Sequence, residues 1–250
     1  IGLKEDAQRY VANPGLALED IFRFTGGMGI KLSVYSENAP SRSGFASSSA
    51  VAAALLTALY NASGQGELTE GELLSNMALL MENEVALKSG KQDTDGPIYP
   101  GIKSLRYLPT EGFLGVDVER LPIDEGALQE NLVLVDSGIQ RPAADGRGRG
   151  LNRRHETFIS RDFNRFWAIT QSLLIHRRIV KAIKVNDWQK LGKLFVEYMK
   201  LRETIDSGAT HSVFDDEAGR KVLLYPFEYL QKEGLIYGGM FSGAMGGGCM

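Results

Sequence analysis

The stretch PSRSGFASSSA, residues Pro40–Ala50, decides the fold because it places small, hydroxyl-bearing residues directly before an apolar run. That run, VAAALLTALYN at Val51–Asn61, is too long and too rich in Ala and Leu for a strand. We therefore expect a buried helix that begins near Ser48 or Ser49. A glycine-containing loop that leads into a helix presents backbone N–H groups to an anion, and the helix dipole adds favourable potential. Such a junction can bind phosphate.

A purely structural interpretation of this junction stays open. Its composition equally fits a flexible serine loop that ends in an ordinary helix N-cap. The stretch is not a Walker A motif, because no Gly-Lys-Ser/Thr follows, and it lacks the G-x-G-x-x-G pattern of dinucleotide sites. A serine hydroxyl at such a junction can additionally ligate Mg²⁺.

The composition is that of a soluble globular protein, with 250 residues, 43% of them hydrophobic and 24% charged. A formal net charge of -3 gives no general attraction for nucleic acid or an anionic membrane, so we expect neither as a partner. The single cysteine, Cys249, fits a reducing cytoplasm, and three scattered histidines form no metal motif. Neither a signal peptide nor an apolar run of about 18 residues appears, and we expect a cytoplasmic protein.

Hydrophobic periodicity and turn residues predict the other elements. We expect helices at Thr69–Leu87, Arg161–Lys184, Asp187–Glu203 and Asp215–Glu233. We expect strands at Gly29–Ser36, Ile102–Leu108 and Asn131–Gly138. Gly90–Gly101 is expected to be a loop, and the Arg- and Gly-rich stretch Pro142–Arg154 an exposed connection between two halves.

Two carboxylates, Glu82 and Asp93, lie eleven positions apart, one late in an expected helix and one in the loop beyond it. A helix that carries an inward-facing acid, followed by a turn back, can bring both acids to one cation and one hydroxyl. The alternative is that Glu82 is a solvated helix charge and Asp93 a turn former, because surface carboxylates are common.

These stretches resemble motifs of the GHMP kinase superfamily, which takes its name from galactokinase, homoserine kinase, mevalonate kinase and phosphomevalonate kinase. The serine-rich stretch resembles its phosphate loop P-x-G-S-G-L-G-S-S-S-A, with departures at Arg42, Phe45 and Ala46. The terminal SGAMGGGCM resembles its G-A-G-G-G-G loop, with a departure at Met245. The resemblance implies that ATP is bound by Ser43, Gly44, Phe45, Ala46, Ser47, Ser48, Ser49, Gly243, Gly246 and Gly247.

The stretch GKQD, Gly90–Asp93, resembles the loop that bears the catalytic aspartate in the sugar-kinase branches, which implies that Asp93 is catalytic. In mevalonate kinase an acidic Mg²⁺ ligand lies eleven residues upstream, at the position of Glu82. The superfamily serine that corresponds to Ser48 contacts Mg²⁺, so the resemblance implies a magnesium site at Ser48 and Glu82. The stretch GPIYPGIK, Gly96–Lys103, resembles fucokinases and indicates a sugar, while heptose phosphate kinases share the GKQD element.

The resemblance implies an α+β fold with two domains. Residues 1–150 would form a domain like ribosomal protein S5 domain 2, and residues 151–250 a ferredoxin-like domain. The family's R-x-D-L-x-G-G substrate element is absent, and we expect it upstream of Ile1.

The implied function is ATP-dependent phosphorylation of a hydroxyl on a fucose- or heptose-like sugar or sugar phosphate, and a homodimer stays open as an assembly. One alternative is a non-catalytic sensor of a sugar or nucleotide, which the departures at Arg42, Ala46 and Met245 keep open. The other is a small-molecule kinase of the mevalonate or homoserine type.

Overall fold

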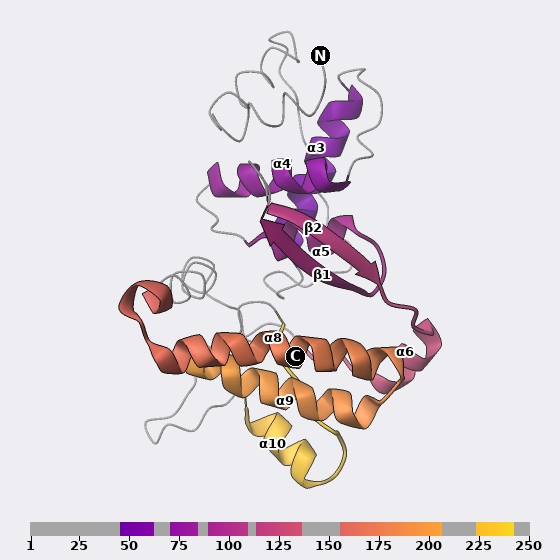
Figure 1. Cartoon of the computed structure of the whole chain (residues 1–250). Coiled ribbons are helices and arrows are strands. Elements are labelled where there is room, and N and C mark those ends of the chain that lie inside the picture. The colour runs from indigo at the N-terminus through magenta and orange to yellow at the C-terminus, as the bar shows by residue number, and fades with distance from the viewer. Residues whose placement is uncertain are drawn as a thin grey trace. The chain divides into compact units, whose positions relative to one another are not determined.

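The computed structural model describes residues 46–62, 71–84, 90–109, 114–136, 156–206 and 224–242, and these residues are mostly helical. Their sheet content is a pair of strands, β1 (Lys103–Pro109) and β2 (Leu114–Arg120), which run antiparallel in Figure 1. The α+β class is therefore seen only in this limited form. The chain divides into two compact units, and in the described residues the division falls between Glu119 and Arg120. The predicted boundary at residue 150 lies outside the described residues and stays a prediction.

Three helices pack against one another in the first unit, α3 (Ser47–Ala62), α4 (Gly71–Glu84) and α5 (Lys91–Ile98), as Figure 1 shows. The predicted helix after the serine-rich stretch is confirmed by α3. Its small side chains allow close packing of the helices. The core between α3 and α4 consists of Ala52, Leu56 and Ala78, with Leu74, Met77 and Met81 packed around it.

The prediction of a loop over Gly90–Gly101 is wrong, because most of this stretch forms α5. The residue before the helix and the third residue within it exchange two hydrogen bonds. The Asp93 N–H donates to the Gly90 carbonyl at 2.9 Å, and the Gly90 N–H donates to Asp93 Oδ2 at 3.2 Å. Gly96 and Pro97, the residues that favoured a loop, lie in the last turn, where the helix is about to end.

The predicted helix at Thr69–Leu87 is confirmed over α4, and its expected ends lie outside the described residues. The predicted strand at Ile102–Leu108 is confirmed by β1. Its partner β2 was not expected, although Leu114, Val116 and Val118 alternate with other residues along it.

In the second unit, α8 (Phe163–Lys184) and α9 (Trp188–Ile205) pack side by side (Figure 1), which confirms the two long helices expected there. Each begins at an aspartate N-cap, because Asp162 accepts from the Arg165 N–H at 3.1 Å and Asp187 from the Lys190 N–H at 3.0 Å. The core of the pair consists of Ala168, Ile175, Ala182, Leu191, Leu194, Leu201 and Ile205. The unit also contains α6 (Glu125–Asn131) and α10 (Tyr225–Lys232). The second of these confirms the C-terminal part of the helix expected at Asp215–Glu233.

The prediction of a strand at Asn131–Gly138 is wrong for Asn131–Val135, while Asp136 forms an isolated β-bridge. Asn131 ends α6, and the apolar residues that follow are not in a strand: their exposed fractions are 49% for Leu132, 78% for Val133, 59% for Leu134 and 46% for Val135. A continuous apolar run forms a buried strand only when neighbouring strands and covering layers enclose it. No described strand pairs with these four residues. None of the described helices is both long and apolar enough to cross a bilayer.

Candidate active site

The serine-rich junction and the first predicted carboxylate meet inside the first unit. Ser49 Oγ donates a 2.6 Å hydrogen bond to Glu82 Oε2, joining the first turn of α3 to the last turns of α4. Both side chains are buried, with exposed fractions of 0% for Ser49 and 2% for Glu82. The second carboxylate oxygen, Oε1 of Glu82, is also buried and has no hydrogen-bond partner. A buried acceptor without a partner is costly, so this oxygen marks a place for a cation or a donor group.

The residues present fit a magnesium ion. Mg²⁺ prefers oxygen ligands and is commonly held by one or two carboxylates, with water and phosphate oxygens completing its shell. Glu82 Oε1 is a suitable carboxylate oxygen, and the hydroxyl-bearing first turn of α3 lies beside it. No group of three or more His, Cys, Asp or Glu in the described residues can hold a metal. A cation here would therefore need ligands from water or from a bound phosphate.

The serine that contacts Glu82 is Ser49, whereas the resemblance had pointed to Ser48 as the metal-binding hydroxyl. Ser48 is the next residue in the same turn and is half-buried. The two neighbouring serines thus belong to one helix start, but only packing of α3 on α4 determines which of them reaches the carboxylate.

Ala46 takes an unusual backbone conformation immediately before α3. Its φ is +53°, in the left-handed region that favours glycine, and its carbonyl accepts the 3.0 Å hydrogen bond from the Ala50 N–H. In the resembled phosphate loop this position is a glycine. Alanine at this position therefore strains the backbone at the start of the helix. Ser43, Gly44, Phe45, Gly243, Gly246 and Gly247 lie outside the described residues.

Asp93 lies in the first turn of α5 and is half-buried. Its Oδ2 accepts the N–H of Gly90, which holds the carboxylate against its own helix start. Because α5 packs on both α3 and α4, the elements that carry Ser49, Glu82 and Asp93 form one cluster of helices. The two acids differ in environment, since Glu82 is fully buried and Asp93 remains accessible.

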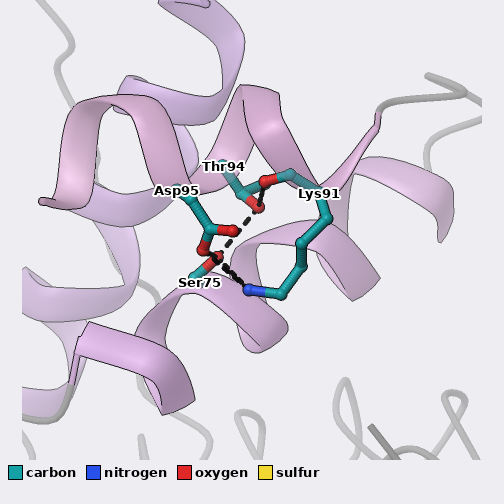
Figure 2. Close-up of polar contacts among 4 residues, drawn as sticks. All are labelled: Ser75, Lys91, Thr94 and Asp95. Carbon is teal, nitrogen blue, oxygen red and sulfur yellow. Dashed lines mark hydrogen bonds and ion pairs between the residues drawn. The ribbon is translucent and has the colours of Figure 1, made fainter. Parts of the chain in front are cut away.

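A polar network that sequence reasoning missed joins α4 to α5, and Figure 2 shows its four members. Lys91 Nζ donates to Ser75 Oγ at 2.7 Å and forms a 2.7 Å ion pair with Asp95 Oδ1. The Ser75 hydroxyl donates to the same oxygen of Asp95 and lies 2.9 Å from the Thr94 hydroxyl. The Thr94 hydroxyl donates to the Lys91 carbonyl at 2.9 Å. The spacing of Lys91 and Asp95 is a helical i,i+4 pair, but expecting a loop there hid this signal.

A tyrosine from β1 lies near this network. The Tyr107 hydroxyl and Oδ2 of Asp95 are both buried, and neither has a partner within ordinary hydrogen-bond distance and angle. Burial, and secondly the negative charge of Asp95, raise the pKa of Tyr107 far above its ordinary value. The phenol therefore stays protonated throughout the physiological range.

Lys103 at the start of β1 closes the C-terminal end of α5. Its ammonium donates to the carbonyls of Gly96 at 2.8 Å, Gly101 at 3.4 Å and Tyr99. A cation at a helix C-terminus is favoured by the helix dipole. The stretch Gly96–Lys103, which resembles fucokinases, thus has a structural role in ending α5.

One family of known proteins matches the part of the chain that carries these residues. The family described as GHMP kinases N terminal domain matches residues 9–95, a range that includes the serine-rich junction, Glu82 and Asp93. These residues are therefore similar to the N-terminal domain of GHMP kinases. The match supports membership of the GHMP superfamily and an activity as a small-molecule kinase. No curated protein matches the chain.

Proposed function

We propose, from this GHMP kinase domain, that the protein transfers the γ-phosphate of ATP to a hydroxyl of a sugar or sugar phosphate. The observation that carries the proposal is the buried Glu82, with one oxygen bonded to Ser49 at the start of α3 and the other without a partner. That arrangement places a negative charge beside a helix N-terminus, and an anionic ligand with a bound cation would satisfy both.

Each residue has a role in this proposal. The first turn of α3 and the preceding residues Ser43–Ala46 would bind the phosphates of ATP, with Gly243, Gly246 and Gly247 beside them. Ser48 and Glu82 would hold Mg²⁺, and Ser49 orients the Glu82 carboxylate. A Mg²⁺ ion at this site supplies positive charge that offsets the charge spread over the transferred phosphoryl group.

Asp93 would meet the acceptor hydroxyl, either by accepting its proton or by orienting it. Its half-buried place at the start of α5 keeps the carboxylate accessible to a substrate. The bond from the Gly90 N–H restricts the carboxylate to one position, which is what a group that aligns a nucleophile requires.

The sugar acceptor rests on the resemblance of Gly96–Lys103 to fucokinases, with heptose phosphates as close competitors. The bonds of Lys103 to three carbonyls give this stretch a structural role as well, so the acceptor must be identified by assay. The proposal keeps the two-domain division at residues 1–150 and 151–250.

A sensor that binds sugar or nucleotide without turnover is the second candidate. The observation that favours it is the left-handed conformation of Ala46, at a position where the resembled loop has glycine. Such strain can alter how closely the backbone approaches the phosphates, as can the departures at Arg42 and Met245.

Release of ADP tests the function and the role of Asp93. We expect the wild-type protein to release ADP with a fucose- or heptose-like acceptor in a panel that also contains mevalonate and homoserine. Asp93→Asn should lower kcat by about 100-fold or more, the usual range for loss of acid–base assistance, and leave MgATP affinity within about twofold.

The matched control is Asp117→Asn, which makes the same chemical change at an exposed ion pair with Arg106 on β1. It should leave kcat unchanged. Undiminished turnover in Asp93→Asn would refute the role of Asp93. Binding of MgATP without ADP release for any acceptor favours the sensor, and activity only with mevalonate or homoserine favours that class of kinase.

A further inference from the structure

The ion pair between Lys91 and Asp95 is buried on the side of α5 that contacts α4. The exposed fraction of the side chain is 4% for Lys91 and 0% for Asp95. Ser75 on α4 bonds to both partners, so ammonium, hydroxyl and carboxylate are connected in a closed set of contacts (Figure 2). These bonds attach one helix to the other with defined geometry.

Asp93 lies between the two members of this pair along α5. At 3.6 residues per turn, a residue two positions away lies about 160–200° around the helix, on the opposite face. The burial agrees, because Lys91 and Asp95 are buried while Asp93 is half-buried. The rotation of α5 that buries the pair therefore also determines where Asp93 lies.

The helix cannot hold this rotation by itself. It has 8 residues and contains Pro97, and isolated helices shorter than about 12 residues are marginal in water. Its two ends are closed by Gly90 and by Lys103, but neither of those contacts attaches it to α4. The network at Ser75 is a polar attachment that does.

Stability alone does not account for this choice of residues. A buried ion pair often stabilises a fold no more than well-packed apolar side chains of the same volume would. Hydrogen bonds and ion pairs nevertheless have strict geometric requirements, and apolar contacts tolerate small rotations and shifts. A buried polar attachment therefore suits a helix whose orientation matters more than its stability.

We propose that Ser75, Lys91 and Asp95 are positioning residues that set the rotation of α5 and thereby the placement of the Asp93 carboxylate. The inference rests on the proposed function, in which Asp93 meets the acceptor hydroxyl. The three residues act through Asp93 rather than on the substrate.

The double variant Lys91→Met with Asp95→Leu separates orientation from stability. It replaces the pair with apolar side chains and leaves no unpaired buried charge, so the melting temperature should stay near that of the wild type. The kcat for ADP release should fall about tenfold to 100-fold, because a displacement on the order of 1 Å has this effect on an aligned nucleophile. The KM for MgATP should change by less than about twofold.

The matched control is Arg106→Met with Asp117→Leu, which removes the same two charges from the exposed pair on the β1–β2 hairpin. Its kcat should equal that of the wild type. A stable Lys91→Met, Asp95→Leu protein with full kcat would overturn the proposal, since the pair would then be a replaceable part of the core.

If the double variant does not fold, Ser75→Ala tests the positioning role instead. This change removes the attachment to α4 and leaves the ion pair in place. We expect a similar loss of kcat in this variant, and full kcat would overturn the proposal.

Hydrogen exchange at the Gly90 amide gives a readout that does not depend on turnover, because this N–H donates to Asp93 Oδ2. Exchange at this amide should be at least about tenfold faster in Ser75→Ala than in the wild type, because the bond to Asp93 would be open more often. Unchanged exchange would overturn the positioning role even in an inactive protein. A different outcome would count against the proposed function alone. In that outcome the wild type releases no ADP, but exchange at the Gly90 amide is still faster in Ser75→Ala.

Discussion

Glu82 is a buried side chain that can still bind a ligand atom. One of its oxygens is bonded to Ser49 Oγ at 2.6 Å, and the other has no partner. A buried carboxylate in this state carries a desolvation cost that the single bond from Ser49 offsets only in part. Residues that are unfavourable for folding are expected where a ligand supplies the missing interaction.

Glu82→Gln should separate function from stability. It keeps the shape of the side chain and removes the buried charge, so the free energy of unfolding should stay equal or rise. The Mg²⁺ concentration for half-maximal ADP release should increase at least about tenfold, because a neutral amide is a poor ligand for a hard cation. A magnesium titration at fixed ATP measures this.

Glu84→Gln is the control, since Glu84 is exposed at the end of the same helix. An unchanged magnesium requirement in Glu82→Gln would exclude that carboxylate from the metal site.

At the scale of the element, the start of α3 combines a helix N-terminus that we propose binds phosphate with a residue in a strained backbone conformation. The left-handed φ of Ala46 precedes the first turn that carries Ser47, Ser48 and Ser49. An alanine in this region is about 1–2 kcal/mol less favourable than in the ordinary helical region, whereas glycine adopts it readily.

Ala46→Gly should therefore raise the free energy of unfolding by up to about 1 kcal/mol, since the relief of strain exceeds the added freedom of the unfolded chain. Ala58→Gly, at an exposed position within α3, should lower it by about 1 kcal/mol. Urea denaturation of both variants measures the difference. Equal destabilisation by both changes would contradict the conformation of Ala46.

At the scale of the whole molecule, binding of nucleotide should increase the free energy of unfolding. The matched domain, residues 9–95, carries the candidate site, so a ligand bound there stabilises the folded chain by mass action. Because Glu82 and the start of α3 are the elements involved, the gain should depend on magnesium.

MgATP at a concentration 100 times its Kd should raise the free energy of unfolding by about 2.7 kcal/mol. Removal of Mg²⁺ with EDTA should abolish most of this gain in the wild type, while Asp93→Asn should respond like the wild type. Thermal denaturation with and without nucleotide measures both effects. Equal stabilisation by ATP with and without the cation would exclude a magnesium-dependent nucleotide site.

The sequence by itself determined the local features of this protein. Helices α3, α8 and α9 were predicted from hydrophobic periodicity, because this signal acts within a few turns of the chain. The serine-rich junction, Glu82 and Asp93 were assigned roles from the resemblance of their stretches to GHMP kinase motifs, which can be seen along the chain without the fold.

Only the tertiary structure decided which of these residues meet. The contact of Glu82 with Ser49 spans 33 positions and depends on how α4 packs on α3. Lys91 and Asp95, which were expected in a loop, lie in α5, and Ser75, 16 positions before Lys91, bonds to both. Leu132–Val135 stayed outside any described strand because strand formation needs a neighbour. Such outcomes depend on contacts between distant residues, which a local pattern does not contain.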